Sequence, residues 1–331
     1  FGYSVSISGD YAIVGAYKEH AGGISDAGAA YIYKRNASTG VWGDEQKISA
    51  SDKAASDWFG HSVSISGDNA IVGVKKANQG GLSDTGAAYI FKRTKTTWNE
   101  VKKLSASDKD ADDWFGYTVG ISSDYAIVGA HMEDTGGDRA GAAYMYEKVV
   151  SGGITRSQVW NATEDQILYG SDPGQDDNFG HAVAVDGNYA VVGSRYNDTG
   201  GTDRGAAFIF HKSGGTWTEQ AMVQPSDTAD NDWFGRGAAI SGDYVIVNAY
   251  AKTNNNTGQG AAYIFYRSGT SWAQQAKLNA SDSEAGDAYS FSVDIDGDYA
   301  IVGSLNEDPG GTSDAGSAYI YVRSGTSWSQ Q

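Results

Sequence analysis

Residues 1–16 read FGYSVSISGDYAIVGA, and closely similar stretches recur along the whole chain of 331 residues. A Phe-Gly pair opens further copies at Phe59, Phe115, Phe179 and Phe234. A sixth copy begins at Tyr289, because its turn Gly297-Asp298 must align with Gly9-Asp10. Complete repeats of 55–64 residues, each with several short alternating segments, are typical of propeller blades.

A second recurring stretch, of the type GAAYIYKR, confirms the register. It begins at Gly28, Gly86, Gly141, Gly205, Gly260 and Gly316. Within the first repeat, the alternation of large and small residues and the turn residues predict strands over 3–8, 11–16, 29–35 and 42 to about 49. The predicted fold is an all-β, six-bladed β-propeller of four-stranded antiparallel blades, forming one domain over residues 1–331. The expected blades span residues 1–58, 59–114, 115–178, 179–233, 234–288 and 289–331.

The connections within each repeat differ in length. The Ser-Gly-Asp turn after the first strand is short, and so is the Ser-Gly-Thr-Ser turn at residues 268–271 between the third and fourth strands. The other two connections are long and polar, and in an up-and-down sheet they lie at the opposite end from the short turns. Because binding residues gather on loops that a rigid scaffold positions, we expect any ligand at this long-loop end.

Composition excludes several partners. The 41 acidic and 24 basic residues give a net charge of −17, which repels nucleic acid. No apolar run is long enough to cross a bilayer, so direct membrane insertion is not expected. The chain has no cysteine, which excludes disulfides and thiolate sites.

The Phe-Gly opening, the Ala-Ile-Val-Gly-Ala strand and the Gly-Ala-Ala-Tyr strand resemble the FG-GAP repeat of integrin α-subunit propellers and bacterial surface proteins. The resemblance implies that the first strand of each blade is innermost and that ligands contact the long-loop end. It also implies an extracellular or cell-surface location, within a larger multidomain chain. The family's Asp-x-Asp-x-Asp-Gly calcium loop is replaced by the short Ser-Gly-Asp-Tyr turn, so that calcium site is not expected. The proline of the GAP segment is also absent.

The most regular polar feature is a pair of aspartates, five residues apart, before each new first strand. The pairs are Asp52 and Asp57, Asp108 and Asp113, Asp172 and Asp177, Asp227 and Asp232, and Asp282 and Asp287. Such a pair can close a loop by accepting backbone N–H bonds, or it can supply hard oxygen ligands to Ca²⁺. Asp26, Asp84, Asp203 and Asp314, before the anchor glycines, could add ligands on the same end. Ca²⁺ is therefore a candidate cofactor, and the structural interpretation stands beside it.

Two further sets of residues are candidates for ligand binding. Trp58, Trp114 and Trp233 precede Phe-Gly pairs and could stack on sugar rings or anchor their loops. The third residue of the first strand varies, and His61, His181 and Arg236 could face a ligand near the central channel or serve only in packing.

We find no nucleophile elbow, phosphate loop or zinc-spaced histidines, and no catalytic residue is assigned. The sequence thus predicts an extracellular adhesion or recognition module that binds a protein or glycan ligand. A carbohydrate-binding, lectin-like propeller is the alternative, and a polysaccharide-degrading enzyme is a third. Whether a seventh repeat or a closing strand completes the propeller stays open.

Overall fold

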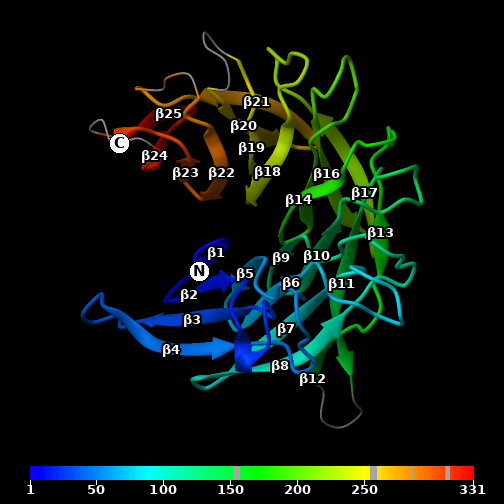
Figure 1. Cartoon of the computed structure of the whole chain (residues 1–331). Coiled ribbons are helices and arrows are strands. Elements are labelled where there is room, and N and C mark those ends of the chain that lie inside the picture. The colour runs from blue at the N-terminus through cyan, green and yellow to red at the C-terminus, as the bar shows by residue number, and fades with distance from the viewer. Residues whose placement is uncertain (152–156, 254–258, 283, 285, 310–313) are drawn as a thin grey trace. The chain divides into compact units, whose positions relative to one another are not determined.

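Short strands joined by turns form six antiparallel sheets, numbered as blades 1 to 6 in chain order (Figure 1). The structure is a computed structural model, and it describes residues 1–151, 157–253, 259–282, 284, 286–309 and 314–331. The chain divides into two compact units, Phe1–Leu168 with blades 1 to 3 and Tyr169–Gln331 with blades 4 to 6. The single domain over residues 1–331 stays a prediction.

Unit 1 contains three blades. Blade 1 consists of β1 (Val5–Ser8), β2 (Tyr11–Ala16), β3 (Ala29–Arg35) and β4 (Trp42–Ile48). Blade 2 consists of β5 (Ser62–Ser66), β6 (Asn69–Val74), β7 (Ala87–Thr94) and β8 (Thr97–Leu104). Blade 3 consists of β9 (Thr118–Ile121), β10 (Tyr125–Ala130), β11 (Ala142–Ser151), β12 (Ser157–Trp160) and β13 (Gln166–Leu168). Its fourth strand is split, because β12 and β13 both pair with β11.

Unit 2 contains the other three blades. Blade 4 consists of β14 (Phe179–Asp186), β15 (Tyr189–Ser194), β16 (Ala206–Ser213) and β17 (Thr216–Val223). Blade 5 consists of β18 (Phe234–Ser241), β19 (Tyr244–Ala249), β20 (Ala261–Ser268) and β21 (Ser271–Leu278). Blade 6 consists of β22 (Tyr289–Asp296), β23 (Tyr299–Ser304), β24 (Ser317–Ser324) and β25 (Ser327–Gln330).

These sheets confirm the predicted fold class: the chain is an all-β, six-bladed β-propeller of antiparallel blades. Among the described residues the helical content is a single 3₁₀ turn, η1 (Ala21–Gly23). No helix in this part of the chain is long and apolar enough to cross a membrane. The first strand starts at Val5 instead of the expected Tyr3, whereas β2 and β3 have the predicted limits. The sixth repeat does begin at Tyr289, whose Cα pairs with that of Ser304.

Consecutive blades of unit 1 contact through the small-residue face of the first strand. The hydroxyl oxygens of Ser4, just before β1, and of Ser6 and Ser8 in β1 accept hydrogen bonds from the backbone N–H groups of Val63, Ile65 and Gly67, at 3.0, 3.2 and 3.1 Å. A larger residue on this face would hold the two sheets apart. The serine alternation in the sequence therefore sets the close spacing of blades.

The two recurring anchors of the sequence meet at the blade junction. The N–H of Phe59 donates to the carbonyl of Ala27 at 3.0 Å, and Gly28 forms a parallel bridge with Phe59, which is fully buried. Gly28 has φ +83°, and a Cβ there would lie 2.1 Å from the carbonyl oxygen of Phe59. A side chain at Gly28 is excluded both by backbone conformation and by this contact.

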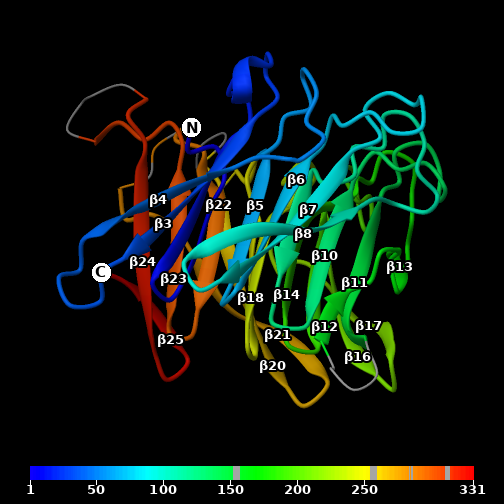
Figure 2. The ribbon, with the colours of Figure 1, turned by 90° about the horizontal axis from the view of Figure 1, so that it is seen from below.

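The long loops of unit 1 lie at the same end of its strands, as expected. The backbone N–H of Trp58, in the loop that enters blade 2, donates to the carbonyl of Asp26 in the β2–β3 loop at 3.3 Å. Figure 2 shows η1 and its loop projecting beyond the strand ends of blade 1. This end of each unit holds the candidate residues.

Candidate functional site

The first aspartate of each pair bonds to side chains of the blade that follows it. Asp52 accepts hydrogen bonds from the hydroxyl of Tyr89 in β7 at 2.5 Å and from the ammonium of Lys103 in β8 at 2.6 Å. A strand-three tyrosine bonds in the same way to three other first aspartates, in the pairs Tyr144 with Asp108, Tyr263 with Asp227 and Tyr319 with Asp282. Blade 4 has Phe208 at that position, and Asp172 accepts a hydrogen bond from Thr199 instead.

The second aspartate closes its own loop. Its carboxylate accepts a hydrogen bond from the backbone N–H three residues earlier, at Ala54, Asp110, Gly174, Ala229 and Glu284. All five of these aspartates are buried, and burial raises the pKa of Asp57, Asp113 and Asp177. The hydrogen bonds of both aspartates support the structural interpretation of the pairs.

Within the described residues, no group of three or more His, Cys, Asp or Glu side chains is arranged to hold a metal ion. Asp26, Asp84, Asp203 and Asp314 adopt left-handed backbone conformations, with φ between 49° and 51°. Asp84 forms an ion pair with Lys76 at 3.0 Å. These loop aspartates therefore shape the turn before the anchor glycine, and the Ca²⁺ assignment of the pairs stays a prediction.

The variable residue of the first strand connects neighbouring blades. Nδ1 of His61 lies 3.1 Å from the carbonyl oxygen of Tyr117, the residue at the same position of the next blade. Nδ1 of His181 is 2.9 Å from the carbonyl oxygen of Arg236, and the Arg236 guanidinium donates in turn to the carbonyl of Phe291 at 2.9 Å. Burial, with a contribution from Lys75, lowers the pKa of His61 to about 4. The imidazole of His61 is therefore neutral at physiological pH, and its hydrogen bond to Tyr117 gives it a structural role.

The three candidate tryptophans occupy an unusual backbone position. Trp58, Trp114 and Trp233 have φ values of 65°, 57° and 54°, and Asn178 and Ala288 share this conformation in the other two junctions. The left-handed region favours glycine and asparagine over large side chains. The backbone conformation therefore does not explain why tryptophan occupies this position. The contacts of its side chain must favour it.

Aromatic rings surround Trp58 at the long-loop end of blades 1 and 2. The ring of Tyr17, the first residue after β2, lies edge-on at 5.1 Å, and the imidazole of His61 is stacked at 6.5 Å with an interplanar angle of 11°. Trp58 is half-buried. Its ring is thus held in one orientation with part of its surface open to solvent.

Three ammonium groups gather around the same ring. The Nζ atoms of Lys18, Lys75 and Lys76 lie 5.6, 5.0 and 4.9 Å from the Trp58 centroid, within the range of cation–π attraction. Among the described residues, only Lys76 of these three has a carboxylate within ion-pair distance. Burial, with the neighbouring charge of Lys76, lowers the pKa of Lys75 to about 8. We call Tyr17, Lys18, Trp58, Lys75 and Lys76 the lysine–tryptophan cluster.

Unit 2 has a related arrangement around Trp233. Its ring is stacked on that of Tyr250 at 6.3 Å and 16°, and the Arg236 guanidinium lies 4.7 Å from the Tyr250 centroid. Arg236 is tied to Phe291, so this cation is already engaged within the chain. The lysine–tryptophan cluster of unit 1 is consequently the better candidate for contact with a ligand.

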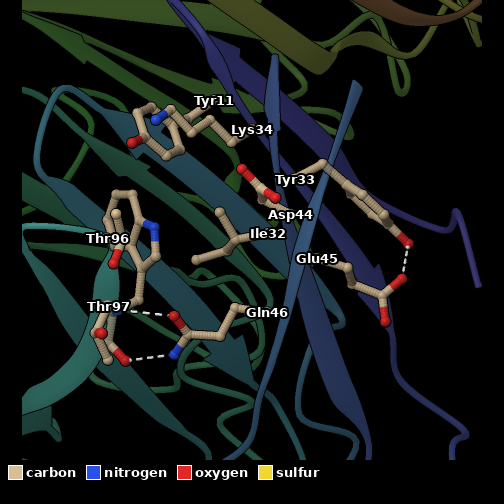
Figure 3. A pocket seen from close by; sticks show the side chains of 10 residues that line it. Tyr11, Ile32, Tyr33, Lys34, Asp44, Glu45, Gln46, Thr96 and Thr97 are labelled. Atoms are coloured by element: carbon tan, nitrogen blue, oxygen red, sulfur yellow. Dashed lines mark hydrogen bonds between the residues drawn. The ribbon is translucent and has the colours of Figure 1, made fainter. Parts of the chain in front are cut away.

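A cavity of about 560 Å³ lies elsewhere in unit 1, between the outer strands of blades 1 and 2 (Figure 3). Its lining includes Tyr33, Glu45 and Gln46, and none of the predicted site residues. Gln46 bonds to both the carbonyl and the N–H of Trp98, and the hydroxyl of Tyr33 donates to Glu45 at 2.7 Å. The side chains of Tyr33, Glu45 and Gln46 are thus already engaged in hydrogen bonds within the chain.

The repeated junctions also identify the family. The FG-GAP repeat matches residues 1–33, 42–91, 98–146, 162–210, 217–265 and 272–321. The chain belongs to the FG-GAP repeat family. Every match of this FG-GAP chain after the first runs across a junction, so each contains an aspartate pair. No curated protein sequence matches the chain.

Similarity to solved structures is found at low sequence identity. The FG-GAP chain is similar to the periplasmic gluconolactonase PpgL of Pseudomonas aeruginosa, with a TM-score of 0.56 and 13% identity over 97% of this chain and 81% of that one. Sqt1 of Saccharomyces cerevisiae gives a TM-score of 0.47 and 8% identity, over 99% of this chain and 84% of that one. At 13% identity the first likeness extends to the fold and carries no activity over to this chain.

Proposed function

We propose that this FG-GAP chain is a non-catalytic recognition module of an extracellular or cell-surface protein. Its ligand is an acidic polysaccharide, which the lysine–tryptophan cluster binds at the long-loop end of blades 1 and 2. The proposal depends above all on one observation, the three ammonium groups within 5.6 Å of the Trp58 ring.

Charge supports an anionic ligand. Three lysines gather in a chain whose net charge is −17, and among the described residues Lys76 is the one of the three with a carboxylate, that of Asp84, within ion-pair distance. Like charges repel, and an anionic ligand would compensate those of Lys18 and Lys75. The acidic remainder of the surface would repel the same ligand elsewhere, which would direct binding to the cluster. Carboxylate or sulfate groups on a sugar chain would accept charge-assisted hydrogen bonds from the ammonium groups.

The aromatic rings support a ligand with flat apolar faces. The half-buried ring of Trp58 is fixed by Tyr17 and His61, so little side-chain entropy is lost when a ligand stacks on it. A sugar ring offers such a face beside its charged groups. An acidic peptide has the charge without a regular stacking face, and it is the competing protein ligand.

Binding to three polymers tests this proposal. Polygalacturonate carries carboxylates on sugar rings, its fully methyl-esterified form has the same rings without charge, and polyglutamate has the charge without rings. We expect binding to polygalacturonate alone, and a loss of at least tenfold in affinity for Trp58→Ala. Trp42→Ala is the matched control, because Trp42 is 40% exposed at the start of β4 and lies outside the cluster.

Equal binding of polyglutamate would favour a protein ligand, and binding of the ester alone would favour a neutral glycan. Failure of all three polymers to bind, or wild-type affinity in Trp58→Ala, would overturn the proposal.

A further inference from the structure

One loop position makes the same main-chain hydrogen bond in all six blades, although its residue type differs. It lies three residues after the second strand, and its carbonyl oxygen accepts a hydrogen bond from the N–H of the anchor glycine. The distances are 2.8–3.0 Å in the pairs Glu19 with Gly28, Ala77 with Gly86, Glu133 with Gly141, Asn197 with Gly205, Lys252 with Gly260 and Glu307 with Gly316. Because the backbone is fixed in this way, the side chains at this position start from equivalent places.

In blades 4 and 5 this side chain donates to the aspartate pair. Nζ of Lys252 lies 2.7 Å from Oδ2 of Asp232 and also donates to the main-chain carbonyl of Asp227. Nδ2 of Asn197 donates to Oδ2 of Asp177 at 3.0 Å and to the carbonyl of Asp172 at 3.3 Å. The second aspartate and the carbonyl of the first thus form a socket for a positively polarised group.

Blade 3 has a glutamate at the same position. Glu133 and Asp113 are 2% and 3% exposed, so both carboxyl groups are buried. One Glu133 oxygen accepts the N–H of Thr135 at 2.8 Å, but Oε2 is buried and has no hydrogen-bond partner among the described residues. At the position where blades 4 and 5 have a side-chain donor, blade 3 therefore has a second carboxylate.

Two buried carboxylates side by side are unfavourable unless a proton or a cation compensates their charge. Glu133 and Asp113 stand at the positions of Lys252 and Asp232 in blade 5, whose side chains lie 2.7 Å apart. In blade 5 the ammonium of Lys252 supplies the compensating positive charge from within the chain. In blade 3, the chain supplies none from this position.

We propose that Asp113 and Glu133, together with the main-chain carbonyl oxygen of Asp108, bind a Ca²⁺ ion in the socket of blade 3. Hard carboxylate and carbonyl oxygens in a loop suit Ca²⁺, which takes six to eight oxygen ligands in flexible geometry. Only two of the ligands are carboxylates, so main-chain oxygens and water complete the shell. This site lies at the junction loops, at the opposite end of the blade from the turn between its first two strands.

Blade 6 repeats the same pair. Glu307 and Asp287 are 7% and 6% exposed, and Oε2 of Glu307 is buried without a partner among the described residues. We expect a second ion here.

Calorimetric titration of the full chain with CaCl₂ at pH 8 tests the proposal, alongside melting in 5 mM CaCl₂ and in EDTA. We expect two ions per chain and a melting temperature roughly 5 °C higher in CaCl₂. Glu133→Lys copies the ammonium of blade 5, so it should fold, bind one ion fewer and lose part of the calcium-dependent rise. Asp124→Lys is the control, because this exposed residue of blade 3 undergoes the same change of charge.

The reverse change provides a gain of function. Lys252→Glu should convert the socket of blade 5 into a third calcium site. The melting temperature of this variant should then depend more strongly on calcium than that of wild type. An unchanged wild-type melting temperature in CaCl₂ and EDTA would overturn the proposal. So would calcium binding by Glu133→Lys equal to that of wild type, because the pair would then hold a shared proton.

Discussion

The ammonium of Lys252 lies 2.7 Å from Oδ2 of Asp232, and the two side chains are only 5% and 2% exposed. Replacement of Lys252 by Met leaves the carboxylate buried without its cation, so the free energy of unfolding at pH 7 should fall by about 3–5 kcal/mol. Urea denaturation measures this loss. The exposed Lys92 in β7 offers the control Lys92→Met, which should stay within about 0.5 kcal/mol of wild type.

The spacing of blades 1 and 2 depends on Gly15 in β2. A Cβ at this residue would lie 2.1 Å from the carbonyl oxygen of Gly60, a backbone atom that cannot rotate away. Gly15→Ala should therefore lower the free energy of unfolding by roughly 3 kcal/mol. Gly43→Ala in β4 is the matched control, since no atom lies within 4 Å of its added Cβ, and equal effects of the two substitutions would refute this explanation.

The aspartate of blade 3 should make the calcium-free protein sensitive to pH. Burial, with the charges of Glu133, Asp110 and Asp108, raises the pKa of Asp113 to about 7. A carboxyl group with a raised pKa in the folded state contributes stability below its unfolded pKa of about 4, and this contribution is lost as the pH rises through about 7. In EDTA, the free energy of unfolding should therefore decrease from pH 5 to pH 8.

Glu133→Gln should reduce this decrease. Its amide can donate to Asp113 as Asn197 does to Asp177, and one buried charge is removed. At pH 8 in EDTA the variant should be about 1–3 kcal/mol more stable than wild type. A pH dependence identical to that of wild type would show that the two carboxyl groups do not interact.

Much of the fold could be predicted because the repeats constrain each other. The Phe-Gly and Gly-Ala-Ala anchors were recognised separately in the sequence, and the structure brings Gly28 against Phe59. The serine alternation over residues 4–8 indicates a small-residue face, which contacts the next blade through Ser4, Ser6 and Ser8. The split fourth strand of blade 3 was not predicted, because its irregular connection follows no repeat.

The site was predicted less well, because its residues come from different loops. The sequence identifies Trp58 as a candidate. Lys18 and Lys76 come from the β2–β3 and β6–β7 loops, and because these loops are far apart in the sequence, their contact with the Trp58 ring could not be predicted. The sequence does contain one signal for the proposed calcium site, because the repeat position of Glu133 in blade 3 is occupied by Lys252 in blade 5. Alignment of the repeats alone shows this reversal of charge beside an invariant aspartate.

The ammonium of Lys75 should make ligand binding depend on pH. Burial, together with the charge of Lys76, lowers the pKa of Lys75 to about 8. Affinity for polygalacturonate should fall about tenfold between pH 7 and pH 9.5, as one charged contact is lost. Lys75→Arg should bind almost equally at the two pH values, because a guanidinium stays charged. A parallel loss of affinity in this variant would exclude Lys75 as the titrating group.

Titration calorimetry of the chain with tetragalacturonate at low and moderate salt tests the proposed recognition most directly. Wild type should bind, with affinity that falls as salt rises, and the double variant Lys18→Gln with Lys76→Gln should lose at least tenfold in affinity while keeping the melting temperature of wild type. Binding of the double variant as tightly as wild type, or no binding by wild type at low salt, would contradict the lysine–tryptophan cluster as the ligand site.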